Sequence, residues 1–103
     1  MKILLSDSAF NDLIAITNYY TDEGVPHVGN DFVNNIISHI ESLKENPDIG
    51  RKVPEFNESN IRELIHVPFR IVYLREVKLI HVVRVWRSER LLNLDDTPAK
   101  TKI

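Results

Sequence analysis

The sequence contains no cysteine and only three glycines among its 103 residues. Without cysteine the chain can form no disulfide, no zinc–thiolate centre and no thiol nucleophile. The glycines, at positions 24, 29 and 50, match neither of the usual glycine-rich phosphate-binding loops. No serine lies in the Gly-x-Ser-x-Gly pattern of the α/β-hydrolases. The sequence thus lacks these common motifs of catalytic and phosphate-binding sites, and we expect no cofactor.

Long apolar runs and metal-ligand patterns are also missing. No apolar run approaches the roughly 20 residues needed to span a bilayer, and the apolar stretch near the N-terminus is too short for a signal peptide. The four histidines, at positions 27, 39, 66 and 81, lack the spacing of zinc ligands, so we expect no metal site. We expect a cytoplasmic protein that binds no membrane, which agrees with the absence of cysteine.

Charge is distributed unevenly along the chain, although its net value is only −2. Residues 1–60 carry four basic and ten acidic side chains, whereas residues 61–92 carry seven basic and three acidic ones. A basic segment within a small domain suggests an anionic partner, although solubility alone would also explain it.

The first half of the chain predicts a short strand over residues 2–5 and then two helices. Apolar residues recur at helical spacing at Ala9, Leu13, Ile16 and Tyr20, and again at Phe32, Ile36, Ile40 and Leu43. We expect Ser6 or Ser8 to cap the first helix and Gly24 to end it. The second helix should begin at Pro26 and run to about residue 46, forming an antiparallel hairpin with the first.

The second half predicts a polar loop over residues 48–60 and then three strands, at 61–67, 69–75 and 78–86. The order of these elements predicts an α+β domain, in which a three-stranded antiparallel sheet packs against the helical hairpin. We expect one domain over residues 1–92, followed by a polar tail over residues 93–103.

The register of the last two strands decides which basic residues lie together. A two-residue hairpin loop would place His81 and Arg87 on the same face as Arg70. A three-residue loop would place Arg84 and Trp86 there instead, because a shift of one residue reverses every side chain. In either case both faces are apolar and contain arginines, while the helices can cover only one. We expect the second face to meet another chain, or its basic residues to line a groove. The alternative is that both faces are core and the arginines extend to the sheet edge.

Four segments, taken in order, resemble the RelE/ParE superfamily of toxins over about residues 2–92. They are the start of the first helix (Ser8, Ala9 and residues 11–14), LKENPDIGRKVPE at 43–55, Arg62-Glu63-Leu64 with FRIVY at 69–73, and VVRVWRSERL at 82–91. The resemblance implies the toxin of a type II toxin–antitoxin pair, bound by a cognate antitoxin in a hetero-oligomer or forming a homodimer. ParE-like members act on DNA gyrase, and RelE-like members cut mRNA on the ribosome.

The sequence departs from the ribonuclease members in two places. Residues 56–60 contain no lysine, and Asn93 and Leu94 stand where those members carry a tyrosine. The resemblance is therefore closer to ParE, and the alternative is a RelE-like mRNA endonuclease.

Two sets of residues follow from this interpretation. The candidate catalytic residues of a ribonuclease are Arg70, Arg87 and Arg90, since guanidinium groups match phosphate oxygens. The candidates for binding the target or the antitoxin are Arg70, His81, Arg84, Trp86, Arg87 and Arg90.

Overall fold

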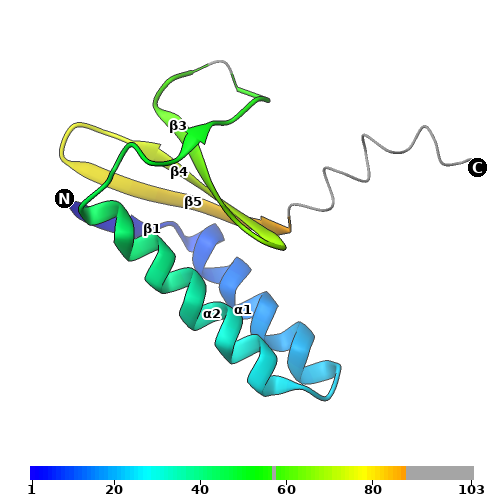
Figure 1. Ribbon diagram of the computed structural model, residues 1–103. Helices are drawn as coiled ribbons and strands as arrows, with labels where there is room; N and C mark the ends of the chain where they lie inside the picture. The colour runs from blue at the N-terminus through cyan, green and yellow to red at the C-terminus, as the bar shows by residue number, and fades with distance from the viewer. Residues whose placement is uncertain (57, 88–103) are drawn as a thin grey trace, which may run out of the picture.

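The computed structural model describes residues 1–56 and 58–87, and in it two helices pack on one face of a five-stranded sheet (Figure 1). The elements in chain order are β1 (Lys2–Leu5), α1 (Asp7–Asp22), α2 (Pro26–Glu41), a short 3₁₀ helix (Ser42–Lys44), β2 (Arg51–Lys52), β3 (Ile61–His66), β4 (Phe69–Arg75) and β5 (Leu79–Arg87). The predicted α+β class is confirmed. Neither α-helix in this described part is long and apolar enough to cross a membrane.

The helical hairpin is confirmed, with boundaries that follow from individual side chains. Ser6 caps α1, and its hydroxyl accepts a hydrogen bond from the N–H of Ala9 at 3.0 Å. Gly24 has φ 82°, a left-handed conformation that favours glycine and lets the chain turn between the helices. Pro26 begins α2. That helix ends at Glu41, earlier than predicted, and continues as the 3₁₀ turn.

The sheet is larger than the predicted three strands. Its order is β1-β5-β4-β3-β2, and β1 runs parallel to β5 while the other neighbours are antiparallel. Two residues of the predicted loop form β2 and pair with β3. The sequence did not predict these pairings, because a parallel partner lies across the whole helical hairpin and a two-residue strand has no apolar alternation.

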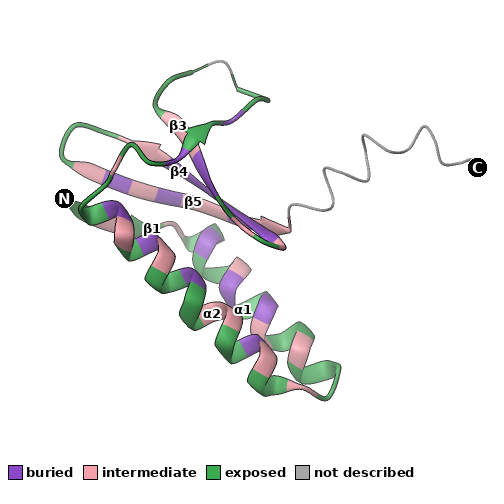
Figure 2. Cartoon of the chain, viewed as in Figure 1, coloured by how far each residue is buried: buried purple, intermediate pink, exposed green. Residues whose placement is uncertain are grey.

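The main core lies between the hairpin and the sheet. It consists of Ala9, Leu13, Ile16, Ile36, Ile40 and Leu43 from the helical segment and Leu64, Phe69, Ile71, Tyr73, Ile80, Val82 and Val85 from the strands. Figure 2 shows buried positions recurring along both helices and through the central strands. Val53 and Val72 are also buried but lie outside this cluster.

A β-bulge in β5 settles the register between β4 and β5. Arg70 pairs with Trp86 and Val72 with Arg84, whereas Tyr73 pairs with Val82, so Val83 is the extra residue. Beyond the bulge, His81 pairs with Leu74. Residues that lie opposite each other share a face, so both residues of the second predicted arrangement are confirmed, whereas the first is right for His81 and wrong for Arg87. Arg84, Trp86 and His81 share the face of Arg70, and Arg87 lies on the helix-facing side.

Candidate functional site

Arg70 is buried on the sheet face that the helices do not cover, which we call the outer face. It is 2% exposed, and Glu63 next to it on β3 is 1% exposed. The Arg70 guanidinium donates to a Glu63 oxygen from Nε and forms an ion pair with it through Nη2. Its Nη1 and Nη2 atoms also lie 3.0 and 3.2 Å from the two carboxylate oxygens of Glu55. Two carboxylates therefore hold this cation in place.

The segment after β2 covers the centre of the outer face. Val53 is fully buried, and Glu55 reaches the guanidinium of Arg70. Partial burial raises the pKa of Glu55, but hydrogen bonds and charge from Arg70 outweigh it, so that the pKa lies below its usual value. Arg51 extends the network, because its Nε atom donates to Glu63 at 2.7 Å. The second face, which was expected to meet another chain, is thus covered at its centre by the chain itself.

Arg84 and Trp86 lie on the same face, closer to the edge of the sheet. The Arg84 guanidinium carbon is 5.0 Å from the centre of the Trp86 ring, and that of Arg70 is 5.9 Å away. Arg84 also donates to both carboxylate oxygens of Asp12 on α1, at 2.8 and 2.9 Å. These hydrogen bonds raise the pKa of Arg84. Arg84 is therefore neutralised within the fold, like Arg70.

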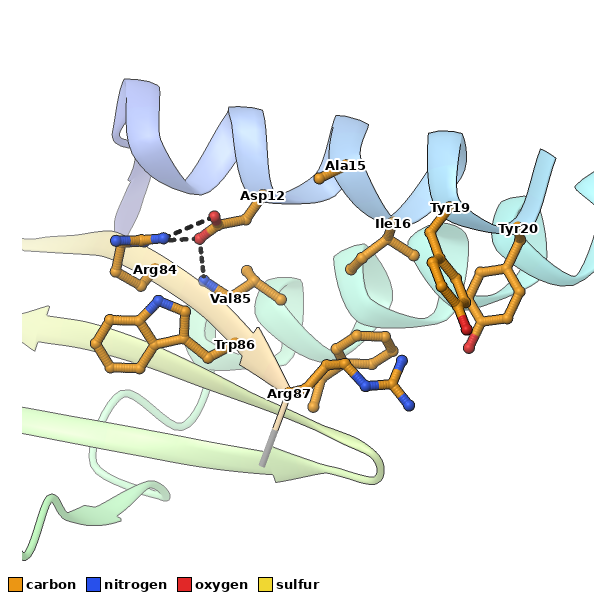
Figure 3. Close-up of a pocket in the computed structure, with 10 residues that line it drawn as sticks. Asp12, Ala15, Ile16, Tyr19, Tyr20, Arg84, Val85, Trp86 and Arg87 are labelled. Atoms are coloured by element: carbon orange, nitrogen blue, oxygen red, sulfur yellow. Dashed lines mark hydrogen bonds and ion pairs between the residues drawn. The ribbon is translucent and has the colours of Figure 1, made fainter. Parts of the chain in front are cut away.

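A groove of about 530 Å³ runs between α1 and the end of β5 (Figure 3). Tyr19 and Tyr20 line it from the helix, and Trp86 and Arg87 line it from the strand. The guanidinium carbon of Arg87 lies 5.4 Å from the centre of the Phe69 ring, which also lines the groove. The groove combines apolar walls with charged groups, and is large enough to receive part of a partner.

The structure brings only some of the six predicted site residues together, and Arg84, Trp86 and Arg87 all line the groove. Arg70, Arg84 and Trp86 form one stacked group on the outer face, and His81 lies on that face beyond the bulge. Arg87 lies in the groove, and Arg90 is outside the described residues.

The carboxylates that hold these arginines were not predicted from the sequence; they belong to Glu55, Glu63 and Asp12. Glu63 did offer a signal of a buried ion pair. An acidic residue within an apolar strand segment needs a cation or a hydrogen-bond donor as its partner if it is buried. Asp12 offered none, because an acidic residue near the start of a helix already suits the helix dipole. Within residues 1–56 and 58–87, no group of three His, Asp or Glu side chains is placed to hold a metal ion.

A family model described as the ParE toxin of the type II toxin–antitoxin system parDE matches residues 3–92. The chain belongs to the ParE toxin family. It is accordingly the toxin component of a type II toxin–antitoxin system, and the resemblance inferred from its four segments is confirmed. A comparison of this ParE-family toxin with the curated proteins gives no match.

Solved structures share the fold of this ParE-family toxin. A structure of the chromosomal ParDE system of P. aeruginosa superposes with a TM-score of 0.72 at 24% identity, covering 84% of this chain and 95% of the other. The YoeB dimer of Staphylococcus aureus gives 0.58 at 21% identity, covering 84% and 94%. The YoeB/ParE toxin of Agrobacterium tumefaciens gives 0.60 at 16% identity, covering 84% and 98%. At these identities the likeness concerns the fold alone.

Proposed function

We propose that this ParE-family toxin inhibits DNA gyrase by binding it, and that a cognate antitoxin neutralises the toxin in the cytoplasm. The observation that carries this proposal is the state of Arg70, which is a candidate both for catalysis and for binding. It is 2% exposed and is engaged by Glu63 and Glu55. A guanidinium in this state supports the fold and is not available to a phosphate.

A ribonuclease role for Arg70 would require a phosphate to displace two carboxylates. Glu63 is buried, and leaving its charge without Arg70 would carry a large desolvation penalty. RNA cleavage also needs a general acid and a general base near the reacting phosphate. His39 and His66 contact each other, with 3.0 Å between their Nδ1 atoms, but His66 pairs with Phe69 on the helix-facing side. These features favour the ParE-like function over the RelE-like alternative.

The test is a supercoiling assay with purified gyrase, relaxed plasmid and ATP. We expect the toxin to inhibit supercoiling at modest excess over the enzyme and to increase the amount of cleaved DNA. The same preparation should leave translated mRNA intact in a ribosome assay. Normal supercoiling together with mRNA cut at defined codon positions would replace this function with the RelE-like one. Absence of both activities, and of growth arrest in cells, would indicate a family member that only binds its antitoxin.

The proposed contact residues for gyrase or antitoxin are those predicted from the sequence that remain accessible at the sheet surface: His81, Arg84, Trp86 and Arg87. A charge reversal, Arg87→Glu, should weaken inhibition, because the change falls at the groove beside α1. Lys52→Glu is the matched control, since Lys52 is exposed on β2 at the opposite edge of the sheet. Equal inhibition by the two variants would remove Arg87 from the contact surface.

The antitoxin is tested separately, by co-expressing the neighbouring reading frames with a tagged toxin. A small protein should co-purify and should restore supercoiling when added to inhibited gyrase. Light scattering of the free and bound forms then distinguishes a homodimer from a hetero-oligomer. If no protein encoded by a neighbouring reading frame binds the toxin, the proposed neutralisation by an antitoxin is wrong. The proposed inhibition of gyrase is not affected by that result.

A further inference from the structure

Two histidines from distant parts of the chain meet between α2 and β3. His39 lies in the last turn of α2, and His66 is the last residue of β3. Their Nδ1 atoms are 3.0 Å apart, and the centres of the two rings are 5.2 Å apart. Both residues are half-buried, and neither lines the groove beside α1. The pair therefore joins the helical hairpin to the sheet at a place separate from the site described above.

The fold holds the backbone on both sides of this pair. His66 lies on the same face of β3 as Leu64, a core residue that is 5% exposed, so its side chain points toward the helices. The carbonyl of His39 accepts a hydrogen bond from the hydroxyl of Ser42 at 2.6 Å, where α2 continues as the 3₁₀ turn. A helix and a strand thus carry the two rings, which gives the rings a defined separation.

Two facing imidazole nitrogens need a positive group between them. A neutral ring carries a proton on only one of its nitrogens, so an Nδ1–Nδ1 contact holds either one proton or a cation. A transition-metal ion can replace the proton, because imidazole nitrogen is a preferred ligand of copper, nickel and zinc. A ligand imidazole must be neutral. Burial, together with the charge of His66, lowers the pKa of His39 and so favours the neutral ring.

The separation of the two nitrogens matches that of neighbouring ligands on one ion. An imidazole nitrogen lies about 2.0–2.1 Å from the metal that it binds. Two such ligands at a right angle are therefore about 2.9 Å apart, and two at the tetrahedral angle are about 3.3 Å apart. The observed 3.0 Å is closer to the right angle. Right angles between ligands are typical of copper(II) and nickel(II), whereas zinc(II) favours the tetrahedron.

We propose that His39 and His66 form a two-histidine site for a divalent transition-metal ion, copper(II) or nickel(II) in preference to zinc(II), which clamps α2 to β3. Both Nδ1 atoms bind the ion, and water molecules fill its other positions. The ring that carried its proton on Nδ1 loses it to solvent and gains one on Nε2, so both imidazoles stay neutral. The spacing of histidines in the sequence does not indicate this site, because the two residues are 27 positions apart.

The test is a calorimetric titration of the untagged full-length toxin with the chlorides of copper(II), nickel(II), zinc(II) and magnesium. We expect one ion per chain, tighter binding of nickel(II) than of zinc(II), and no binding of magnesium, which prefers oxygen ligands. An ion concentration about ten times Kd should raise Tm by about 5–10 °C, because the ion binds the folded chain. The electron paramagnetic resonance spectrum of the copper form should show coupling to two imidazole nitrogens.

Single substitutions identify the ligands. His39→Gln and His66→Gln should each weaken binding by at least about tenfold and leave coupling to one nitrogen at most. His27→Gln is the matched control, since His27 is exposed at the other end of α2, and it should bind the ions like the parent.

Several results would overturn the site. They are the absence of saturable binding at one ion per chain, equal weakening by His27→Gln, and coupling to fewer than two nitrogens in the parent. The last measurement does not require any variant to fold. Tighter binding of zinc(II) than of nickel(II) would overturn the right-angle geometry.

The metal site is independent of the proposed function, because neither histidine is among the proposed contact residues for gyrase or antitoxin. If the toxin binds no ion and still inhibits gyrase, this inference is wrong and the proposed function stands. If the ion binds at the two histidines but the toxin leaves gyrase unaffected, the proposed function is wrong and the metal site remains.

Discussion

Replacing Arg70 with methionine tests whether this residue acts in folding or on the target. The change removes the cation between Glu63 and Glu55 while keeping an apolar side chain of similar length. Breaking a buried ion pair by removing one partner costs about 3–5 kcal/mol, because the other charge stays buried. Arg51, whose side chain is 62% exposed, still reaches Glu63 at 2.7 Å. We therefore expect Arg70→Met to lower the free energy of unfolding by an amount near the lower limit, about 3 kcal/mol.

Urea and thermal unfolding followed by circular dichroism measure this loss. In a domain of this size each kcal/mol lowers Tm by about 4–8 °C, so Arg70→Met should lower it by roughly 12–24 °C. Arg75→Met is the matched control. Arg75 lies in the same strand, and its Nε atom is 2.9 Å from an exposed carboxylate of Asp48, so its loss should cost about 0–1 kcal/mol.

A double variant separates the buried charge from the lost packing. Arg70→Met combined with Glu63→Met leaves no charge buried at this position, and its stability should return to within about 1 kcal/mol of the parent. The double variant should also inhibit gyrase like the parent. If Arg70→Met unfolds at the same urea concentration as the parent and yet no longer inhibits gyrase, the structural role of Arg70 is refuted. Arg70 would then act directly on the target.

Three further changes test other parts of the fold. Tyr73→Phe removes the hydroxyl that accepts from the N–H of Gly50 at 3.0 Å, and should cost about 1–3 kcal/mol in urea unfolding. Gly24→Ala places a side chain at φ 82° and should cost about 1 kcal/mol by the same measurement. Burial, together with the charge of His66, lowers the pKa of His39 from 6.5, so protons bind the unfolded chain preferentially. Stability should therefore fall as the pH drops below about 6.5, and His39→Gln should reduce this dependence; a pH-independent stability would contradict it.

Much of the local structure was predictable, because it depends on neighbours in the chain. The spacing of Leu13 and Ile16 predicted the buried side of α1, and Gly24 and Pro26 predicted the turn between the helices. The three long strands begin and end within about one residue of their predicted limits. The choice between Ser6 and Ser8 as the cap needed the structure, since both residues have a suitable side chain.

The partners of the strands were less predictable. The apolar run at the start of the chain predicted a strand, but nothing in it indicates that β1 lies parallel to β5 on the far side of the hairpin. β2 was included in a predicted loop because two polar residues carry no periodic signal. Such pairings join residues that are far apart in sequence. Which strands pair therefore depends on tertiary packing and not on the local sequence.

The sequence by itself determined the class of the fold, the helical hairpin, the strand segments and the likeness to one toxin superfamily. It also indicated Arg70 as the residue on which the competing functions depend. Only the tertiary structure decided what that arginine contacts, because the extra residue Val83 sets the register and the segment after β2 brings Glu55 over the outer face. Burial and ion pairing arise from contacts between distant segments, and they place this candidate phosphate ligand between two carboxylates.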